Sequence, residues 1–162
     1  MTATNLEVVP ADRRSNWLSL LEVSVREVFE IMVGSNLHAV PPDQTLPRLE
    51  FTAMVGLAGR ICGVLTLCTT AHSAALMASK MLGIEPQEAD PQTWDAIGEV
   101  CNMIAGNFKN KLPGGSEPCL LSVPTVISGG DYNFHSLSDG DRLQTILAFD
   151  GVPIVVSLEL HT

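Results

Sequence analysis

The sequence has little positive charge. Nine Lys and Arg residues stand against eighteen Asp and Glu residues, which gives a net charge of −9 at pH 7. The basic residues are scattered between Arg13 and Arg142, and no run of them is longer than two. Nucleic acids and anionic membrane surfaces are both bound through clustered basic side chains. We therefore expect neither a nucleic-acid partner nor a membrane partner.

Long apolar runs and paired cysteines are also missing. The most apolar stretch, residues 51–67, is interrupted by Arg60 and three glycines, so it does not have the pattern of a membrane-spanning helix. The first twenty residues lack the basic start and apolar centre of a signal peptide. The four cysteines contain no Cys-x-x-Cys pair. We expect buried, reduced thiols and a cytoplasmic location.

The sequence lacks several motifs of catalysis. It contains no Gly-x-x-x-x-Gly-Lys phosphate loop, no Gly-x-Ser-x-Gly elbow and no His-Glu-x-x-His zinc motif. The four histidines lie far apart, and none has a second candidate ligand at metal-binding spacing. We expect no metal site and no cofactor bound by this chain itself.

The N-terminal part of the sequence predicts a tail followed by a helix. Residues 1–14 are polar and are expected to form a flexible tail before a single domain over residues 15–162. Glu22 and Arg26 form a favourable pair four residues apart, and Gly34 is a plausible helix end. The apolar residues of this helix recur on one face: Trp17, Leu21, Val25, Val28 and Met32.

Two segments predict β-hairpins. One covers residues 51–69 around Gly59-Arg60, and the other covers residues 143–160 around Asp150-Gly151. A further strand is expected over residues 120–128, where Pro124 indicates a sheet edge or a bulge.

Helices are expected between the hairpins. Thr70 can cap a helix over residues 71–82 that Gly83 ends. Helices and hairpins thus alternate along the chain and should separate into two layers. The predicted fold class is α+β, an antiparallel sheet built from hairpins and packed against long helices.

A third helix is the most informative segment. Asp90 followed by Pro91 is a strong helix start, and the helix extends to about Leu112. At helical spacing, one stripe of it is apolar and faces the core: Trp94, Ile97, Cys101, Ile104, Phe108 and Leu112.

A second stripe of this helix, formed by Asp95, Glu99, Asn102, Gly106 and Lys109, is unfavourable for helix stability. Gly106 costs roughly 1 kcal/mol relative to Ala in a helix interior. Asp95 and Glu99 are like charges four residues apart, and Asn102 is a poor helix former. The stripe is either an ordinary solvated face, with Gly106 making room for a neighbouring strand, or a surface for a partner that brings positive charge.

The segment Glu99-Val-Cys-Asn102, followed by Gly106-Asn-Phe-Lys109, resembles the Glu-x-x-Asn…Gly-x-x-Lys helix of the CheX-like chemotaxis phosphatases, which belong with the CheC and FliY proteins. The order of the other elements over residues 17–160 is similar as well. These include the glycine-bearing hairpin at 51–69 and the helix that ends in Met81-Leu82-Gly83.

The resemblance implies a two-layer CheC/CheX-like fold and hydrolysis of the aspartyl phosphate on the receiver domain of a CheY-type response regulator. Glu99 would engage a lysine of the receiver, and Asn102 would orient the attacking water in its active site. Asp95, Gly106 and Lys109 are candidates for further partner contacts. Mg²⁺ is expected on the phosphorylated partner. One Glu-x-x-Asn motif, as in CheX, also implies a homodimer.

Two other functions stay open at this point. A non-catalytic interaction module of the same fold would bind a receiver domain or another signalling partner through the acidic stripe, without changing the lifetime of the phosphate. A dimer without any phosphoprotein partner is the third possibility. Faster loss of phosphate from a receiver in the presence of this chain would exclude both.

Overall fold

The computed structural model describes residues 11–85, 90–112, 118–129 and 140–161, and side chains from Ser15 onward. Its helices and strands follow the alternation expected from the sequence. In chain order they are α1 (Ala11–Val28), the π-helical turn η1 (Phe29–Val33), β1 (His38–Ala39), β2 (Phe51–Gly59), β3 (Gly63–Thr69), α2 (Ala71–Leu82), α3 (Pro91–Lys111), β4 (Cys119–Leu121), β5 (Thr125–Ser128), β6 (Arg142–Phe149) and β7 (Val152–Leu160).

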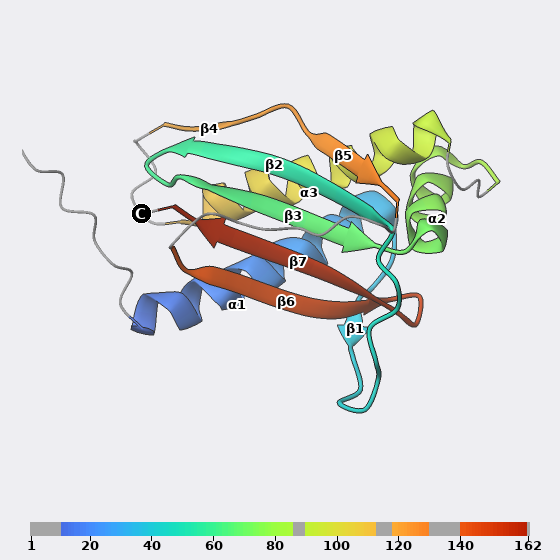
Figure 1. The fold of residues 1–162 in the computed structure, drawn as a ribbon, viewed down its shortest axis with the longest axis horizontal. Helices are drawn as coiled ribbons and strands as arrows, with labels where there is room; N and C mark the ends of the chain where they lie inside the picture. Colours follow the sequence, from blue (N-terminus) through green and yellow to red (C-terminus); the bar gives the residue numbers. More distant parts are fainter. Residues whose placement is uncertain (1–10, 86–89, 113–117, 130–139, 162) are drawn as a thin grey trace, which may run out of the picture.

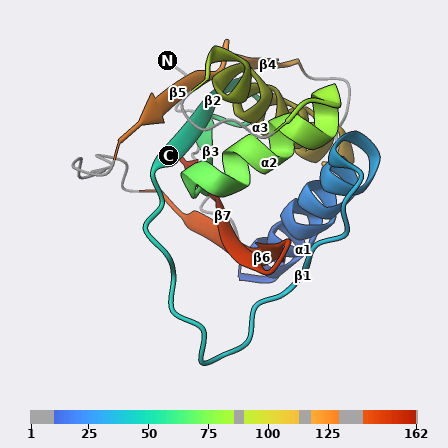
Figure 2. The ribbon, with the colours of Figure 1, turned by 90° about the vertical axis from the view of Figure 1, so that its right-hand side faces the viewer.

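Within the described residues, seven strands form one antiparallel sheet. Their order is β1-β6-β7-β3-β2-β4, and β5 pairs with β2 as well. Figures 1 and 2 show the helices on one side of this sheet, with α2 at one end of the helical layer. This arrangement confirms the predicted two-layer α+β fold. α1 begins at Ala11, so the predicted tail is wrong for residues 11–14, which are helical; residues 1–10 lie outside the described part of the chain, and for them the tail stays a prediction.

The core lies between the helices and the inner face of the sheet. Alternate residues of a strand point to the same face, and those of β2 that face the helices are buried: Phe51, Ala53, Val55 and Leu57. The predicted apolar stripe of α3 supplies the opposite wall through Ile97, Cys101, Ile104 and Phe108, all of which are fully buried. This packing decides which side of α3 is left for solvent.

Both predicted hairpins form. β2 pairs with β3, and β6 pairs with β7 around Asp150 and Gly151, whose φ angles of 49° and 80° suit the tight turn between two twisted strands. The strand expected over residues 120–128 is interrupted near Pro124. β4 and β5 flank the interruption and both pair with β2, which agrees with the position of a proline at a sheet edge.

The helix ends predicted from capping residues are confirmed. Thr70 Oγ1 accepts a hydrogen bond from the Ser73 N–H at 3.0 Å, and the Asp90 carboxylate accepts one from the Gln92 N–H at 2.9 Å. Gly83 ends α2 in the left-handed conformation, with a φ of 68°. None of the described helices is long and apolar enough to cross a membrane.

The π-helical turn changes which residues of the first helix are buried. The predicted Glu22–Arg26 ion pair forms at 3.1 Å, but Met32, expected in the core, is 39% exposed, while Phe29 and Val33 are buried. A π-turn holds one more residue than an α-turn. The residues that follow Val28 are therefore rotated relative to the α-helical pattern, and the prediction for Met32 is wrong.

Two other expectations about burial are also wrong. Trp94 is 37% exposed, and the neighbouring Thr93 is buried instead, because the first half of α3 packs against α2 as well as against the sheet. Cys62 is exposed, since it lies in the turn between β2 and β3, whereas Cys101 and Cys119 are buried as expected. All four cysteines are free.

We predict that Asp90→Ala lowers the free energy of unfolding by about 1 kcal/mol, because the first turn of α3 loses the acceptor of its Gln92 N–H. Urea-induced unfolding followed by circular dichroism measures this change. Asp90→Asn keeps a side-chain acceptor and is the matched control, with a stability close to that of the wild type. Equal losses in both variants would contradict the capping role.

Candidate functional site

The second stripe of α3 does not pack into the core. Glu99 is exposed, and Asn102 and Gly106 on the following turns are half-buried. Residues three apart on a helix lie on the same face, with Cβ atoms roughly 5–6 Å apart. In the part of the chain that the structure describes, the side chains of Glu99 and Asn102 form no hydrogen bond or ion pair. Both polar groups are therefore free to act on a partner.

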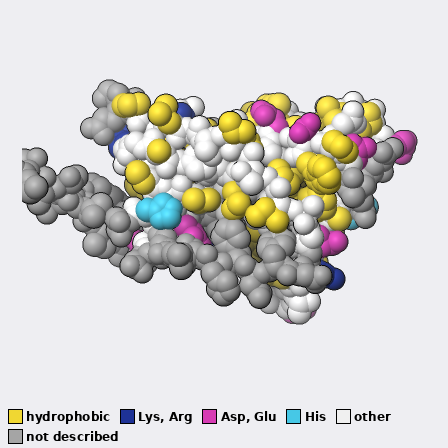
Figure 3. All heavy atoms as spheres, turned by 45° about the horizontal axis from the view of Figure 1, so that its top comes forward, with side chains coloured by type: hydrophobic (Ala, Val, Ile, Leu, Met, Phe, Trp, Pro, Cys, Tyr) yellow, Lys and Arg dark blue, Asp and Glu magenta, His cyan; other side chains and the backbone are white. Residues whose placement is uncertain are grey.

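A hollow of about 370 Å³ lies beside Glu99, between the end of α2 and the first half of α3. Its walls combine apolar groups with two carboxylates, and the residues that line it are Met81, Leu82, Gln92, Asp95, Ala96 and Glu99. Figure 3 shows acidic side chains gathered toward the end of the molecule where α2 lies. Such a hollow suits a side chain with an apolar stem and a positively charged end.

The two glycines in the middle of α3 have different surroundings. A Cβ on Gly98 would meet Pro124 Cβ and Val126 Cγ2 at 3.4 Å, so Gly98 allows α3 to pack closely against β5. A Cβ on Gly106 would meet only Leu121 Cδ1, at 3.8 Å. The neighbouring strand therefore does not require a glycine at position 106.

Lys109 is held by the chain itself. Its Nζ donates a hydrogen bond of 2.8 Å to the carbonyl oxygen of Cys119, the first residue of β4. This contact ties the last turns of α3 to the sheet edge. Within the described residues, Lys109 thus has a structural partner that its position in the polar stripe did not indicate.

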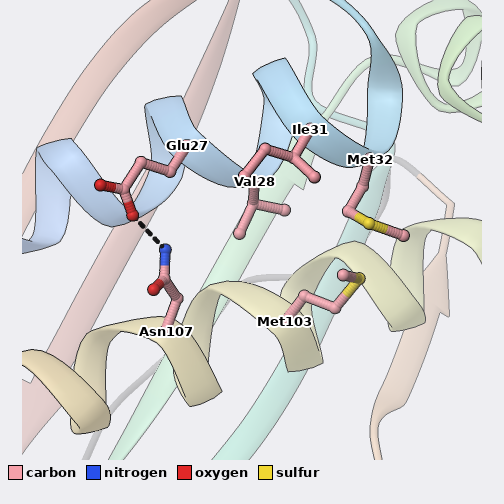
Figure 4. Close-up of a pocket in the computed structure, with 6 residues that line it drawn as sticks. All are labelled: Glu27, Val28, Ile31, Met32, Met103 and Asn107. Atoms are coloured by element: carbon pink, nitrogen blue, oxygen red, sulfur yellow. Dashed lines mark hydrogen bonds between the residues drawn. The ribbon is translucent and has the colours of Figure 1, made fainter.

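A second hollow, of about 190 Å³, lies further along α3, where this helix meets α1 and η1. Figure 4 shows Val28, Ile31 and Met32 on one side of it and Met103 and Asn107 on the other. Met103 directly follows Asn102 in the sequence, so this hollow begins next to the second stripe of α3.

One end of the second hollow is closed by an ionic contact between α1 and α3. Glu27 Oε2 accepts a hydrogen bond from Asn107 Nδ2 at 2.8 Å and lies 2.8 Å from Lys111 Nζ. The hydrogen bond from Lys111, followed by that from Asn107, holds the pKa of Glu27 below its ordinary value. The carboxylate is thereby kept charged and compensated at neutral pH.

The buried thiol of Cys101 is unsuited to nucleophilic chemistry. Burial, and to a smaller extent the nearby Cys68, raises the pKa of the Cys101 thiol to about 12. A thiol needs to ionise before it attacks as a nucleophile, so Cys101 serves the core. Among the described residues, no group of three or more His, Cys, Asp and Glu side chains is placed to hold a metal ion.

The structure brings only part of the predicted second stripe of α3 together. Asp95 and Glu99 line one hollow, and Asn102 and Gly106 follow them, whereas Lys109 reaches toward β4. Sequence reasoning missed both hollows, because part of each wall comes from another helix, α2 for the first hollow and α1 with η1 for the second. The Met81-Leu82 end of α2 is part of the family resemblance, but no spacing within the sequence indicates that it lies beside α3.

Comparisons with known proteins found a matching family model and a related protein. The family model "Chemotaxis phosphatase CheX" matches residues 51–147. The CheY-P phosphatase CheX of Thermotoga maritima is 33% identical over 118 residues, which cover 70% of this chain and 76% of that protein.

Solved structures share the fold. The chemotaxis protein CheX from Vibrio vulnificus aligns with a TM-score of 0.77 at 19% identity, over 91% of this chain and 98% of that one. CheX in a CheX–CheY–BeF₃–Mg²⁺ complex from Borrelia burgdorferi aligns with a TM-score of 0.73 at 22% identity, over 90% of this chain and 98% of that one. At these identities, the two structures support the fold alone.

We predict that Gly106→Ala raises the free energy of unfolding by about 1 kcal/mol, because Ala is favoured over Gly inside a helix and the added methyl group has room. Urea unfolding provides the measurement. Gly98→Ala is the matched control, and its gain should be smaller because the methyl group would press on Pro124 and Val126. A loss of stability in Gly106→Ala would show that the packing of α3 requires this glycine.

We also predict that Glu27 makes stability depend on pH in the acid range. Its pKa is lower in the folded chain than the ordinary 4.5, so its contribution is present above pH 4.5 and is lost as the pH falls through the folded-state pKa. Wild type should therefore exceed Glu27→Gln in unfolding free energy near pH 7, and the difference should shrink below pH 4.5. Urea unfolding at a series of pH values tests this. A difference that does not change with pH would contradict the ionic role of Glu27.

Proposed function

The chain belongs to the CheX family of chemotaxis phosphatases, and we propose that it hydrolyses the aspartyl phosphate of a CheY-type response regulator through Glu99 and Asn102. One observation carries the assignment of these residues. A carboxylate and an amide lie three residues apart on the solvent side of one buried helix, and neither has a partner among the described residues. A single helix can then present both groups to the same site on another protein.

Glu99 has the role of a docking carboxylate. It is exposed and shares its hollow with Asp95 and with the apolar end of α2. A lysine of the receiver would find two carboxylates for its ammonium group and apolar walls for its stem. The chain as a whole carries a net charge of −9, so it attracts only basic surfaces over long distances. The local contacts of Glu99 and Asp95 therefore set the orientation of the receiver.

Asn102 has the role of positioning water. Its amide oxygen can accept a hydrogen bond from a water molecule whose oxygen attacks phosphorus in line with the bond to the aspartyl oxygen. That bond breaks, the receiver regains its carboxylate, and phosphate leaves. The amide is neutral, so it does not repel the anionic phosphoryl group as a carboxylate would. Positioning of this kind is a large part of phosphoryl-transfer catalysis.

The remaining groups of the reaction belong to the partner. The aspartyl phosphate is part of the receiver, and Mg²⁺ held by the receiver supplies neutralisation of the phosphoryl charge. The chain itself contributes the rigid helix that holds the two side chains in register. Gly106 leaves space one turn beyond Asn102 for close approach of the receiver backbone, and Lys109 fixes the end of α3 to β4.

The proposal extends to assembly and location. We propose a homodimer that leaves α3 exposed, as the resemblance to single-motif CheX proteins implies. The sheet edge formed by β4 and β5 supports self-association, since edge strands carry unpaired backbone groups and Leu120 of β4 is 70% exposed. The proposed setting is the cytoplasm, with the chain from the start of α1 at Ala11 acting as one domain.

We predict that Asn102→Ala lowers the stimulated rate of phosphate loss by about a hundredfold, because the attacking water loses its orientation. The measurement is phosphate release from a CheY-type receiver that has been phosphorylated with acetyl phosphate and Mg²⁺. Asn110→Ala, which removes an exposed amide two turns further along α3, is the matched control and should leave the rate unchanged.

Binding separates the role of Asn102 from that of Glu99. Asn102→Ala should still bind a receiver held in its active form by beryllofluoride, whereas Glu99→Lys should weaken binding at least tenfold through like-charge repulsion. Wild-type activity in Asn102→Ala would refute the role of this amide. Binding by the wild type without faster phosphate loss would instead identify a non-catalytic interaction module.

A further inference from the structure

η1 turns two apolar side chains out of the core. Ile31 is 76% exposed and Met32 is 39% exposed. The turn is closed by Gly34, whose N–H donates to the carbonyl oxygen of Phe29 and whose φ is 70°. Single π-turns are rare and occur frequently at functional sites. Here the turn buries Phe29 and Val33 and leaves Ile31 and Met32 outside the core, beside α3.

The exposed side chains face the helix that carries Glu99 and Asn102. We use the name apolar patch for Val28, Ile31, Met32 and Met103, which line the hollow between α1, η1 and α3 (Figure 4). Met103 follows Asn102 directly in the sequence. A protein that brings its active site onto Asn102 therefore also comes close to the apolar patch.

The hollow is suited to an apolar group, because most of its lining is apolar and it has no uncompensated charge among the described residues. The only carboxylate among its described lining residues, Glu27, is already compensated by Lys111 and Asn107. Its volume of about 190 Å³ exceeds that of an engineered apolar cavity of about 150 Å³ that holds a benzene molecule. The hollow can thus accept one aromatic or branched aliphatic side chain.

We propose that the apolar patch is a second contact for the phosphorylated receiver domain, which places one apolar side chain in the hollow while Glu99 and Asn102 engage its active site. This inference rests on the proposed function. Two polar side chains alone bury little area, whereas even weak specific interfaces bury several hundred Å² per partner and centre on an apolar anchor. Methionine side chains suit such a contact because they adapt to the shape of the group they meet.

The test is steady-state hydrolysis of the phosphorylated receiver by Ile31→Ser/Met32→Gln. Both side chains are partly or largely exposed, so the double variant should keep its fold. We expect a roughly tenfold higher KM with kcat within twofold of the wild type, since the patch contributes binding that is the same before and during the reaction. Leu46→Ser is the matched control, because Leu46 is 50% exposed in the loop between β1 and β2, and its KM should not change.

The outcomes separate this inference from the proposed function. An active wild type with the same KM in the double variant overturns the inference and leaves the proposed function standing. A lower kcat at unchanged KM also overturns it, because the patch would then act on the reacting groups. Sedimentation equilibrium decides whether a second copy of the chain occupies the patch, and a higher KM accompanied by loss of the dimer would overturn the inference. A wild type without activity overturns both proposals.

Discussion

Burial of one stripe of α3 against β2 and β3 is the contact on which the candidate site depends. Ile97, Ile104 and Phe108 are fully buried, and Phe108 also meets Trp17 of α1 edge to face, with ring centroids 6.3 Å apart. A helix held in this way cannot rotate, because rotation would expose its large apolar side chains to water. The solvent side of α3 is fixed as a consequence, and with it the positions of Glu99 and Asn102.

A fixed pair of polar side chains is sufficient for the proposed chemistry because the receiver supplies the other groups that the reaction needs. An acyl phosphate is labile, and the receiver holds the phosphoryl group, so the catalyst needs to orient a water molecule and to dock in register. The unfavourable features of the α3 surface are consistent with this use. Asp95 and Glu99 repel each other, and Gly106 weakens the helix without serving the packing of a neighbouring strand. These costs to stability are offset by the core packing of the same helix.

Features that depend on neighbours along the chain could be predicted from the sequence, and features that depend on other elements could not. Thr70 and Asp90 cap helices through residues two or three positions away, so their roles follow from local order. The exposure of Met32 results from a π-turn, which no residue spacing in the sequence predicts. The hydrogen bond of Lys109 to β4 and the hollow beside Met103 require the tertiary packing of α3. The family pattern in the sequence predicts Glu99 and Asn102 as the catalytic pair, and the structure adds the surroundings of the two side chains.

The most direct test of the central claim is whether this chain shortens the lifetime of an aspartyl phosphate repeatedly without being consumed. A CheY-type receiver domain from the same organism is phosphorylated with acetyl phosphate and Mg²⁺, the excess reagent is removed, and phosphate release is followed with sub-stoichiometric amounts of the wild-type protein. The account predicts faster release whose total greatly exceeds the amount of protein added. Release at the spontaneous rate, or release that stops at one phosphate per protein molecule, would contradict it.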